Sequence, residues 1–217
     1  MVNHQINEEI LIPAGAVSVT GNLIIPENAK AIIVFSHGSG SSRLSSRNKF
    51  VAEVLQKNGF GTLLFDLLTL QEDLDRNKRF DIALLTERLT QVTEWLLREE
   101  RTKGLDIGYF GASTGAAATL EAAAQLGDQV KAIVSRGGRP DLAAHKLPVV
   151  TSPTLLIVGS LDYEVIQLNE LAFNLLKAEK EITIVKDATH LFEEPGKLEE
   201  VSEIALAWFQ KHLQSGK

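Results

Sequence analysis

The sequence predicts an α/β fold with a mostly parallel central sheet, an antiparallel N-terminal strand pair and helices on both faces. Short apolar runs alternate with amphipathic segments along most of the chain, and parallel strands require such helical crossovers. The segments Glu8–Pro13 and Val17–Pro26 instead alternate apolar and polar residues around a turn, which is typical of an antiparallel pair. A length of 217 residues without a linker-like stretch indicates one domain over residues 1–217.

Further strands are predicted from apolar runs rich in β-branched residues, each of which ends in a polar or glycine-rich loop. Continuous runs of this kind are typical of central strands that are covered on both faces. In chain order these predicted strands are Ala29–Ser36, Phe60–Asp66, Leu105–Phe110, Gln129–Ser135, Thr154–Gly159 and Glu181–Val185.

Helices are predicted between these strands from apolar residues spaced three and four apart. The segment Leu67–Arg79 is polar, lacks such a period and is predicted to be a loop able to overhang a site. The predicted helices are Ser45–Asn58, Phe80–Glu99, the alanine-rich segment closing at Gly127, the segment after Asp162 and Lys197–Leu213.

Composition excludes several classes of function. A net charge of −6 gives no support to nucleic-acid binding, and no apolar run approaches the length of a membrane span. The absence of cysteine excludes disulfides, thiolate metal sites and a cysteine nucleophile. The histidines show no metal-ligand spacing, so we expect no metal. The chemistry predicted below requires no cofactor, and we expect none. No secretory signal is visible, and we expect a cytoplasmic protein.

The segment Gly111-Ala112-Ser113-Thr114-Gly115 has the Gly-x-Ser-x-Gly pattern of a nucleophile elbow. A serine in a sharp turn between a strand and a helix requires very small neighbours, and its hydroxyl then stands clear of the sheet. The pattern alone also fits an ordinary strand–turn–helix. Residues elsewhere in the chain must therefore decide between the two interpretations.

Ser113, Asp162 and His190 each follow a predicted strand, and the carboxyl ends of parallel strands meet at one edge of a sheet. His190 can take the proton of the Ser113 hydroxyl, and Asp162 can orient the imidazole. Asp66 and Glu164 are alternative acids. These positions predict a Ser–His–Asp triad.

Two backbone amides are predicted to form the oxyanion hole. The Ser39 amide lies in a glycine-rich loop after the neighbouring strand, and the Thr114 amide begins the helix after the elbow.

Together these residues resemble the α/β-hydrolases, and within them the compact branch that is similar to dienelactone hydrolases. The resemblance rests on four motifs in the family's order, and it extends from about Leu23 to Phe209. It implies an α/β-hydrolase fold. The stretch between Ser135 and Thr154 is short, so we expect no large cap domain. Dienelactone hydrolases proper have a cysteine nucleophile, so Ser113 favours a serine esterase. The four motifs are His37-Gly38-Ser39-Gly40, Gly111–Gly115, Leu161-Asp162 and Ala188-Thr189-His190.

Arginines near the predicted site suggest binding of an anionic ester, because guanidinium groups bind carboxylate and phosphate bidentately. Arg43 and Arg136 are the substrate-binding candidates, with Tyr163 as a possible wall of the pocket. Arg47 and Arg139 lie close to them in sequence. In the alternative interpretation these arginines only brace loops by pairing with Asp66, Asp141 or Glu193.

The sequence therefore predicts a serine hydrolase that cleaves carboxylic esters or lactones of small molecules through an acyl-enzyme. The alternative is a non-catalytic α/β-hydrolase scaffold that binds a small ligand or a protein partner. We expect a small-molecule substrate and neither nucleic acid nor a membrane as partner. The sequence leaves the oligomeric state open.

Overall fold

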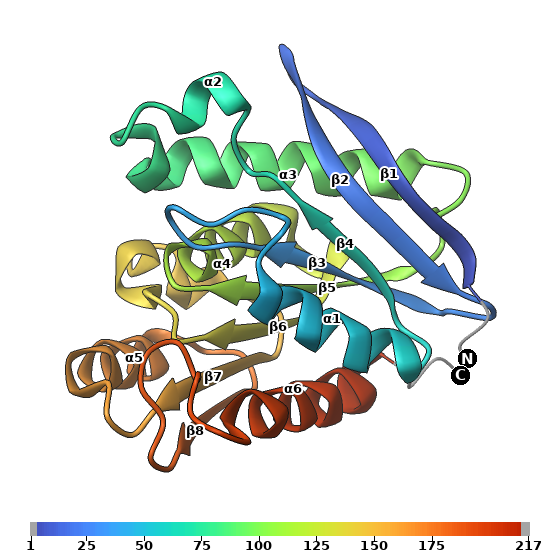
Figure 1. Cartoon of the computed structure of the whole chain (residues 1–217). Helices are drawn as coiled ribbons and strands as arrows, with labels where there is room; N and C mark the ends of the chain where they lie inside the picture. The colour runs from blue at the N-terminus through green and yellow to red at the C-terminus, as the bar shows by residue number, and fades with distance from the viewer. Residues whose placement is uncertain (1–3, 214–217) are drawn as a thin grey trace.

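The computed structural model describes residues 4–213, and these residues build one eight-stranded sheet (Figure 1). The strands are β1 (His4–Ala14), β2 (Val17–Pro26), β3 (Ala31–Ser36), β4 (Gly61–Phe65), β5 (Asp106–Ala112), β6 (Val130–Arg136), β7 (Thr154–Gly159) and β8 (Lys180–Val185). Their order across the sheet is β1-β2-β4-β3-β5-β6-β7-β8. β2 is antiparallel to both of its neighbours, and every later pair is parallel. The predicted mixed sheet is confirmed.

Helices cover both faces of this sheet, as predicted. α1 (Ser46–Lys57) and α6 (Lys197–Leu213) pack on one face, while α3 (Ile82–Arg98), α4 (Thr114–Leu126) and α5 (Tyr163–Leu175) pack on the other (Figure 1). Successive side chains of a strand point to opposite faces, so each central strand contributes to both cores. This double coverage explains why the central strands read as continuous apolar runs.

The segment between β4 and α3 differs from the predicted loop. It contains α2 (Leu70–Asp73) and a short 3₁₀ turn at Lys78–Phe80. A capping box begins α2: the Thr69 hydroxyl accepts from the Glu72 amide, and the Glu72 carboxylate accepts from the Thr69 amide. A four-residue helix is too short to show an apolar period, which explains why the sequence pattern did not reveal it.

The connection between β6 and β7 contains only two short 3₁₀ helices, Pro140–Ala143 and Leu147–Val149. Within residues 4–213 no large cap domain covers the sheet edge, as the sequence predicted. None of the helices in this range is both long enough and apolar enough to cross a membrane. Loops, short helical turns and the first turns of longer helices therefore form the edge at which the parallel strands end.

Candidate active site

Ser113 occupies a strained backbone position between β5 and α4. Its φ of 51° and ψ of −123° lie in a region that non-glycine residues rarely adopt, at a cost of about 1–3 kcal/mol. A Cβ on Gly111 would lie 2.5 Å from the Ala116 Cα, and a Cβ on Gly115 would lie 2.2 Å from the Ser36 carbonyl oxygen. The two glycines are thus required by close backbone approach. This geometry is that of a nucleophile elbow.

Asp162 and His190 lie in hydrogen-bond contact beside the elbow. Asp162 follows β7, His190 follows β8, and His190 Nδ1 lies 2.6 Å from Asp162 Oδ2. The Leu161 amide donates to the Ala188 carbonyl oxygen at 3.0 Å and ties the two loops together. A carboxylate on Nδ1 leaves Nε2 as the nitrogen able to accept a proton.

The two alternative acids do not contact His190. Asp66 accepts hydrogen bonds from the Arg43 amide and guanidinium, and Glu164 is exposed on the first turn of α5. Of the three acids that the sequence suggested, the structure brings only Asp162 to the histidine.

Ser113 and His190 line one cavity of about 220 Å³ at the edge of the sheet. Within residues 4–213 the Ser113 hydroxyl makes no hydrogen bond, although His190 lines the same cavity. Catalytic hydrogen bonds often tighten only when a substrate is bound. The other lining residues are Gly38, Ser39, Ser41, Ser45, Arg47, Asn48, Ala112, Arg136 and Leu191.

The two predicted oxyanion donors differ in availability. The Thr114 amide begins α4, where a helix leaves its first amides without an intrahelical acceptor. The Ser39 amide donates to the Thr114 hydroxyl oxygen at 2.9 Å. An oxyanion must therefore share or replace this hydrogen bond to use the Ser39 amide.

His37 braces the loop that carries Ser39. Its Nδ1 lies 3.0 Å from the Gly38 carbonyl oxygen, and its Nε2 accepts from the Leu67 amide at 3.1 Å. Nε2 must be unprotonated to accept, and burial lowers the pKa of His37 below its ordinary value. His37 therefore has a structural role here, in agreement with its neutral, buried state.

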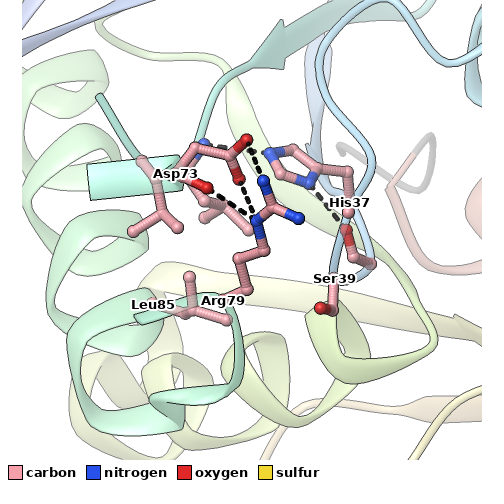
Figure 2. Close-up of a pocket in the computed structure, with 9 residues that line it drawn as sticks. His37, Ser39, Asp73, Arg79 and Leu85 are labelled. Atoms are coloured by element: carbon pink, nitrogen blue, oxygen red, sulfur yellow. Dashed lines mark hydrogen bonds and ion pairs between the residues drawn. The ribbon is translucent and has the colours of Figure 1, made fainter. Parts of the chain in front are cut away.

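Behind this loop the segment containing α2 is fastened by an ion pair (Figure 2). The Arg79 Nε donates to the Asp73 carbonyl oxygen at 2.7 Å, and its Nη2 donates to the Asp73 carboxylate at 3.0 Å. The small cavity between His37, Ser39 and this pair measures about 10 Å³, which is room for one water molecule. The segment thus faces the Ser39 loop across this small cavity, and none of its residues lines the Ser113 cavity.

The four arginines at this edge separate into three paired residues and one unpaired residue. Arg43 bonds to Asp66 and Glu9, and it lines a different cavity, between β2 and the segment after β4. Arg47 bonds to Glu193 at 2.6 Å, and Arg139 bonds to Asp141 through two hydrogen bonds. Arg136 has no acidic partner within residues 4–213, and it lines the Ser113 cavity.

Two substrate-binding candidates therefore lie outside the cavity that Ser113 and His190 line. The charge of Arg43 is already neutralised by carboxylates from β1 and from the end of β4. Tyr163 is the first residue of α5, is 69% exposed and points to solvent, so it does not line the cavity.

Sequence reasoning did not assign a role to Gly137 or Asn48. Gly137 has a φ of 51°, and a Cβ there would lie 3.1 Å from the His190 carbonyl oxygen and 3.4 Å from His190 Nδ1. It allows the end of β6 to approach the histidine. Asn48 is buried in the first turn of α1 and contacts Arg136. No signal in the sequence indicated these tertiary contacts.

Comparison with known proteins agrees with this geometry. A model of the dienelactone hydrolase family matches residues 19–213. The chain belongs to the dienelactone hydrolase family. The resemblance seen in the sequence is thereby confirmed, and the family relationship covers both the Ser39 loop and the triad positions.

Solved structures show the same fold. A dienelactone hydrolase from Anabaena variabilis is 51% identical, with a TM-score of 0.95 over 97% of this chain and 99% of that one. Est1E from Butyrivibrio proteoclasticus is 15% identical, with a TM-score of 0.81 over 94% of this chain and 98% of its own. The second likeness concerns the α/β-hydrolase fold alone.

Two Mycobacterium tuberculosis sequences are 54% identical over 207 residues, which is 95% of this chain. They carry the provisional name phosphoribosyl transferase. The chain spans about half of their length, 47%.

Proposed function

We propose that this dienelactone hydrolase family member hydrolyses carboxylic esters or lactones of small molecules through a covalent acyl-enzyme. The observation that carries the proposal is the 2.6 Å Asp162–His190 contact in the loops beside a serine held at φ 51°. A histidine with a purely structural role would explain the contact with Asp162, but it would not explain why the neighbouring serine is held in a strained conformation.

In the proposed first step, Ser113 Oγ attacks the carbonyl carbon while His190 Nε2 takes its proton. The negative charge that develops on the carbonyl oxygen is stabilised by the Thr114 amide and, once its present hydrogen bond is shared or broken, by the Ser39 amide. The C–O bond to the alcohol then breaks, and the alcohol leaves with the proton from His190. Asp162 stabilises the imidazolium in between.

In the second step, His190 takes a proton from water, and the resulting hydroxide attacks the acyl carbon. The bond to Ser113 Oγ breaks, the serine regains its proton from His190, and the acid is released. A lactone follows the same path, except that its alcohol stays attached to the acyl group.

The experiment is labelling with a fluorophosphonate probe, with hydrolysis of a short-chain 4-nitrophenyl ester measured in parallel. We expect the wild type to be labelled and to turn over, and Ser113→Ala and His190→Ala to lose both. Ser18→Ala and His145→Ala are matched controls, because Ser18 is exposed on β2 and the His145 side chain is 66% exposed. Absence of labelling in folded wild type would overturn the proposal and favour a ligand-binding scaffold.

A further inference from the structure

Arg136 is a buried positive charge that has no counterion among residues 4–213. The residue is 7% exposed, and its Nε and Nη1 make no hydrogen bond within the described part of the chain. Its Nη2 makes one long contact of 3.4 Å, to the neutral amide oxygen of Asn48. Burial, together with the nearby charge of Arg47, lowers the pKa of Arg136 to about 10, so the guanidinium is still charged at neutral pH.

Such an arrangement is costly, because a buried charge is ordinarily paired and a buried donor is ordinarily bonded. Arg43, Arg47 and Arg139 at the same sheet edge follow that rule, since each has a carboxylate within 3.0 Å. Among residues 4–213 Arg136 has no such partner, and a bound anion would supply one.

The direction of the Arg136 side chain follows from its position on β6. Arg136 pairs with Ala112 in the register of β5 and β6, and Ala112 is the residue directly before Ser113. Arg136 shares its side of the strand with Ala132 and Val134, which pack among residues of α1 and α6. The guanidinium therefore lies beneath the first turn of α1, in the cavity that Ser113 and His190 line.

The first turn of α1 adds to this positive potential. Ser45 caps the twelve-residue helix, and Ser45, Arg47 and Asn48 all line the cavity. The amide groups at a helix N-terminus attract anions. The Arg47 guanidinium, whose Nε is also without a partner, reaches the same cavity while its Nη1 is bonded to Glu193.

We propose that Arg136 and the first turn of α1 form a subsite for an anionic oxygen group, a carboxylate or a phosphate, carried by the ester or lactone substrate. This inference rests on the proposed function, because it names the substrate class of the same site. In the free protein the subsite is an unpaired charge beside the nucleophile. A bound carboxylate or phosphate pairs with Arg136 and positions the scissile carbonyl near Ser113.

A stability measurement separates this role from a structural one. Thermal unfolding of the wild type is compared with Arg136→Met, Arg136→Lys and the control Arg139→Met, in sodium phosphate and in sodium chloride of equal ionic strength. We expect Arg136→Met to raise Tm in chloride and to abolish the further rise that phosphate gives the wild type. A lower Tm for Arg136→Met in chloride, with an undiminished phosphate effect, would overturn the proposal.

A kinetic measurement tests the subsite with substrates. The mono-4-nitrophenyl ester of glutaric acid and 4-nitrophenyl 3-phosphonopropanoate are compared with the neutral 4-nitrophenyl pentanoate. We expect the anionic-to-neutral ratio of kcat/KM to fall roughly 10- to 150-fold in Arg136→Met, because bonds to charged groups are lost. The ratio should fall less in Arg136→Lys, and it should keep its wild-type value in Arg139→Met. The two anionic esters distinguish carboxylate from phosphate recognition.

The two proposals fail in different ways. The fluorophosphonate probe carries no anionic group, so its labelling of Ser113 reports on the nucleophile alone. Labelling with no preference for either anionic ester would overturn the subsite and leave ester hydrolysis standing. Conversely, an unlabelled protein whose phosphate-dependent Tm rise requires Arg136 would support the subsite and overturn hydrolysis.

Discussion

The Ser39 amide and the Thr114 hydroxyl are joined by a 2.9 Å hydrogen bond. This bond connects the two segments that carry the predicted oxyanion donors, the loop after β3 and the start of α4. It fixes their relative position before any substrate is present.

Thr114→Val should therefore lower kcat on the order of tenfold with little change in KM, because small displacements of catalytic groups cost much activity. Thr114→Ser keeps the hydroxyl and should retain most of the activity. Steady-state kinetics with a 4-nitrophenyl ester measures both variants. An increase of kcat in Thr114→Val would show instead that the hydroxyl obstructs the Ser39 amide.

Asp162→Asn should lower kcat by about 10³–10⁴-fold, because the amide no longer holds His190 in the tautomer that accepts the serine proton. Asp66→Asn and Glu164→Gln are the matched controls, since neither acid contacts His190. Both control variants should keep a kcat within a few-fold of the wild-type value. If Asp66→Asn were the more damaging substitution, the acid of the triad would have to be reassigned.

Gly115→Ala should destabilise the protein by several kcal/mol, on the order of 3 or more, because its Cβ would lie 2.2 Å from the Ser36 carbonyl oxygen. Gly61→Ala is the control, since its Cβ would meet the Ala31 carbonyl oxygen at 3.4 Å, an ordinary contact. Urea unfolding gives both free energies. Equal losses of unfolding free energy in the two variants would contradict the conclusion that close backbone packing at the elbow requires glycine.

Glu193→Gln removes the carboxylate that bonds to Arg47, a residue that lines the Ser113 cavity. The Glu193 side chain is 61% exposed, so the free energy of unfolding should change by less than about 1 kcal/mol. The freed Arg47 should lower the KM of an anionic ester a few-fold while the KM of a neutral ester is unaffected. An unchanged KM for the anionic ester would exclude Arg47 from the subsite.

The lowered pKa of His37 makes stability depend on pH. Well above pH 6.5, the pKa of His37 in the unfolded chain, the imidazole is neutral in both the folded and the unfolded protein. As the pH falls below 6.5, the unfolded chain binds a proton at His37 before the folded protein does. The free energy of unfolding therefore decreases. Urea midpoints should therefore fall between pH 7.5 and 5.5. His37→Gln should reduce this fall, and a smaller part due to His212, whose pKa burial also lowers, should remain. His145→Gln serves as the control, and an equal effect of that variant would contradict this origin.

Much of the fold and of the site followed from the sequence because both depend on local pattern. Apolar runs located the central strands, and the topology of parallel strands places residues that follow them at one edge. The same topology led us to expect Ser113 and His190 at one edge, whereas the contact with His190 was needed to choose Asp162 among the three candidate acids. The bounds of β7 and α6 agree residue for residue with those predicted.

Which of the four arginines is paired with an acid could not be predicted in the same way. Arg43, Arg47, Arg136 and Arg139 look alike in the sequence, and each could have been paired or free. Arg139 pairs locally, with Asp141 two residues further on. Arg43 and Arg47 instead bond to Glu9 on β1 and to Glu193 after His190, both far away in the chain. Local patterns do not decide such long-range pairings.

The sequence by itself predicted the fold class and the elbow, and it placed Ser113, His190 and three candidate acids in loops of the sheet, because strand order and chain direction fix where loop residues emerge. Only the tertiary structure decided that Arg43 is neutralised, that Tyr163 faces solvent and that Arg136 is buried unpaired beside Ser113. The physical reason is that charge pairing and burial depend on three-dimensional neighbours, whereas periodicity records only which face of an element is covered.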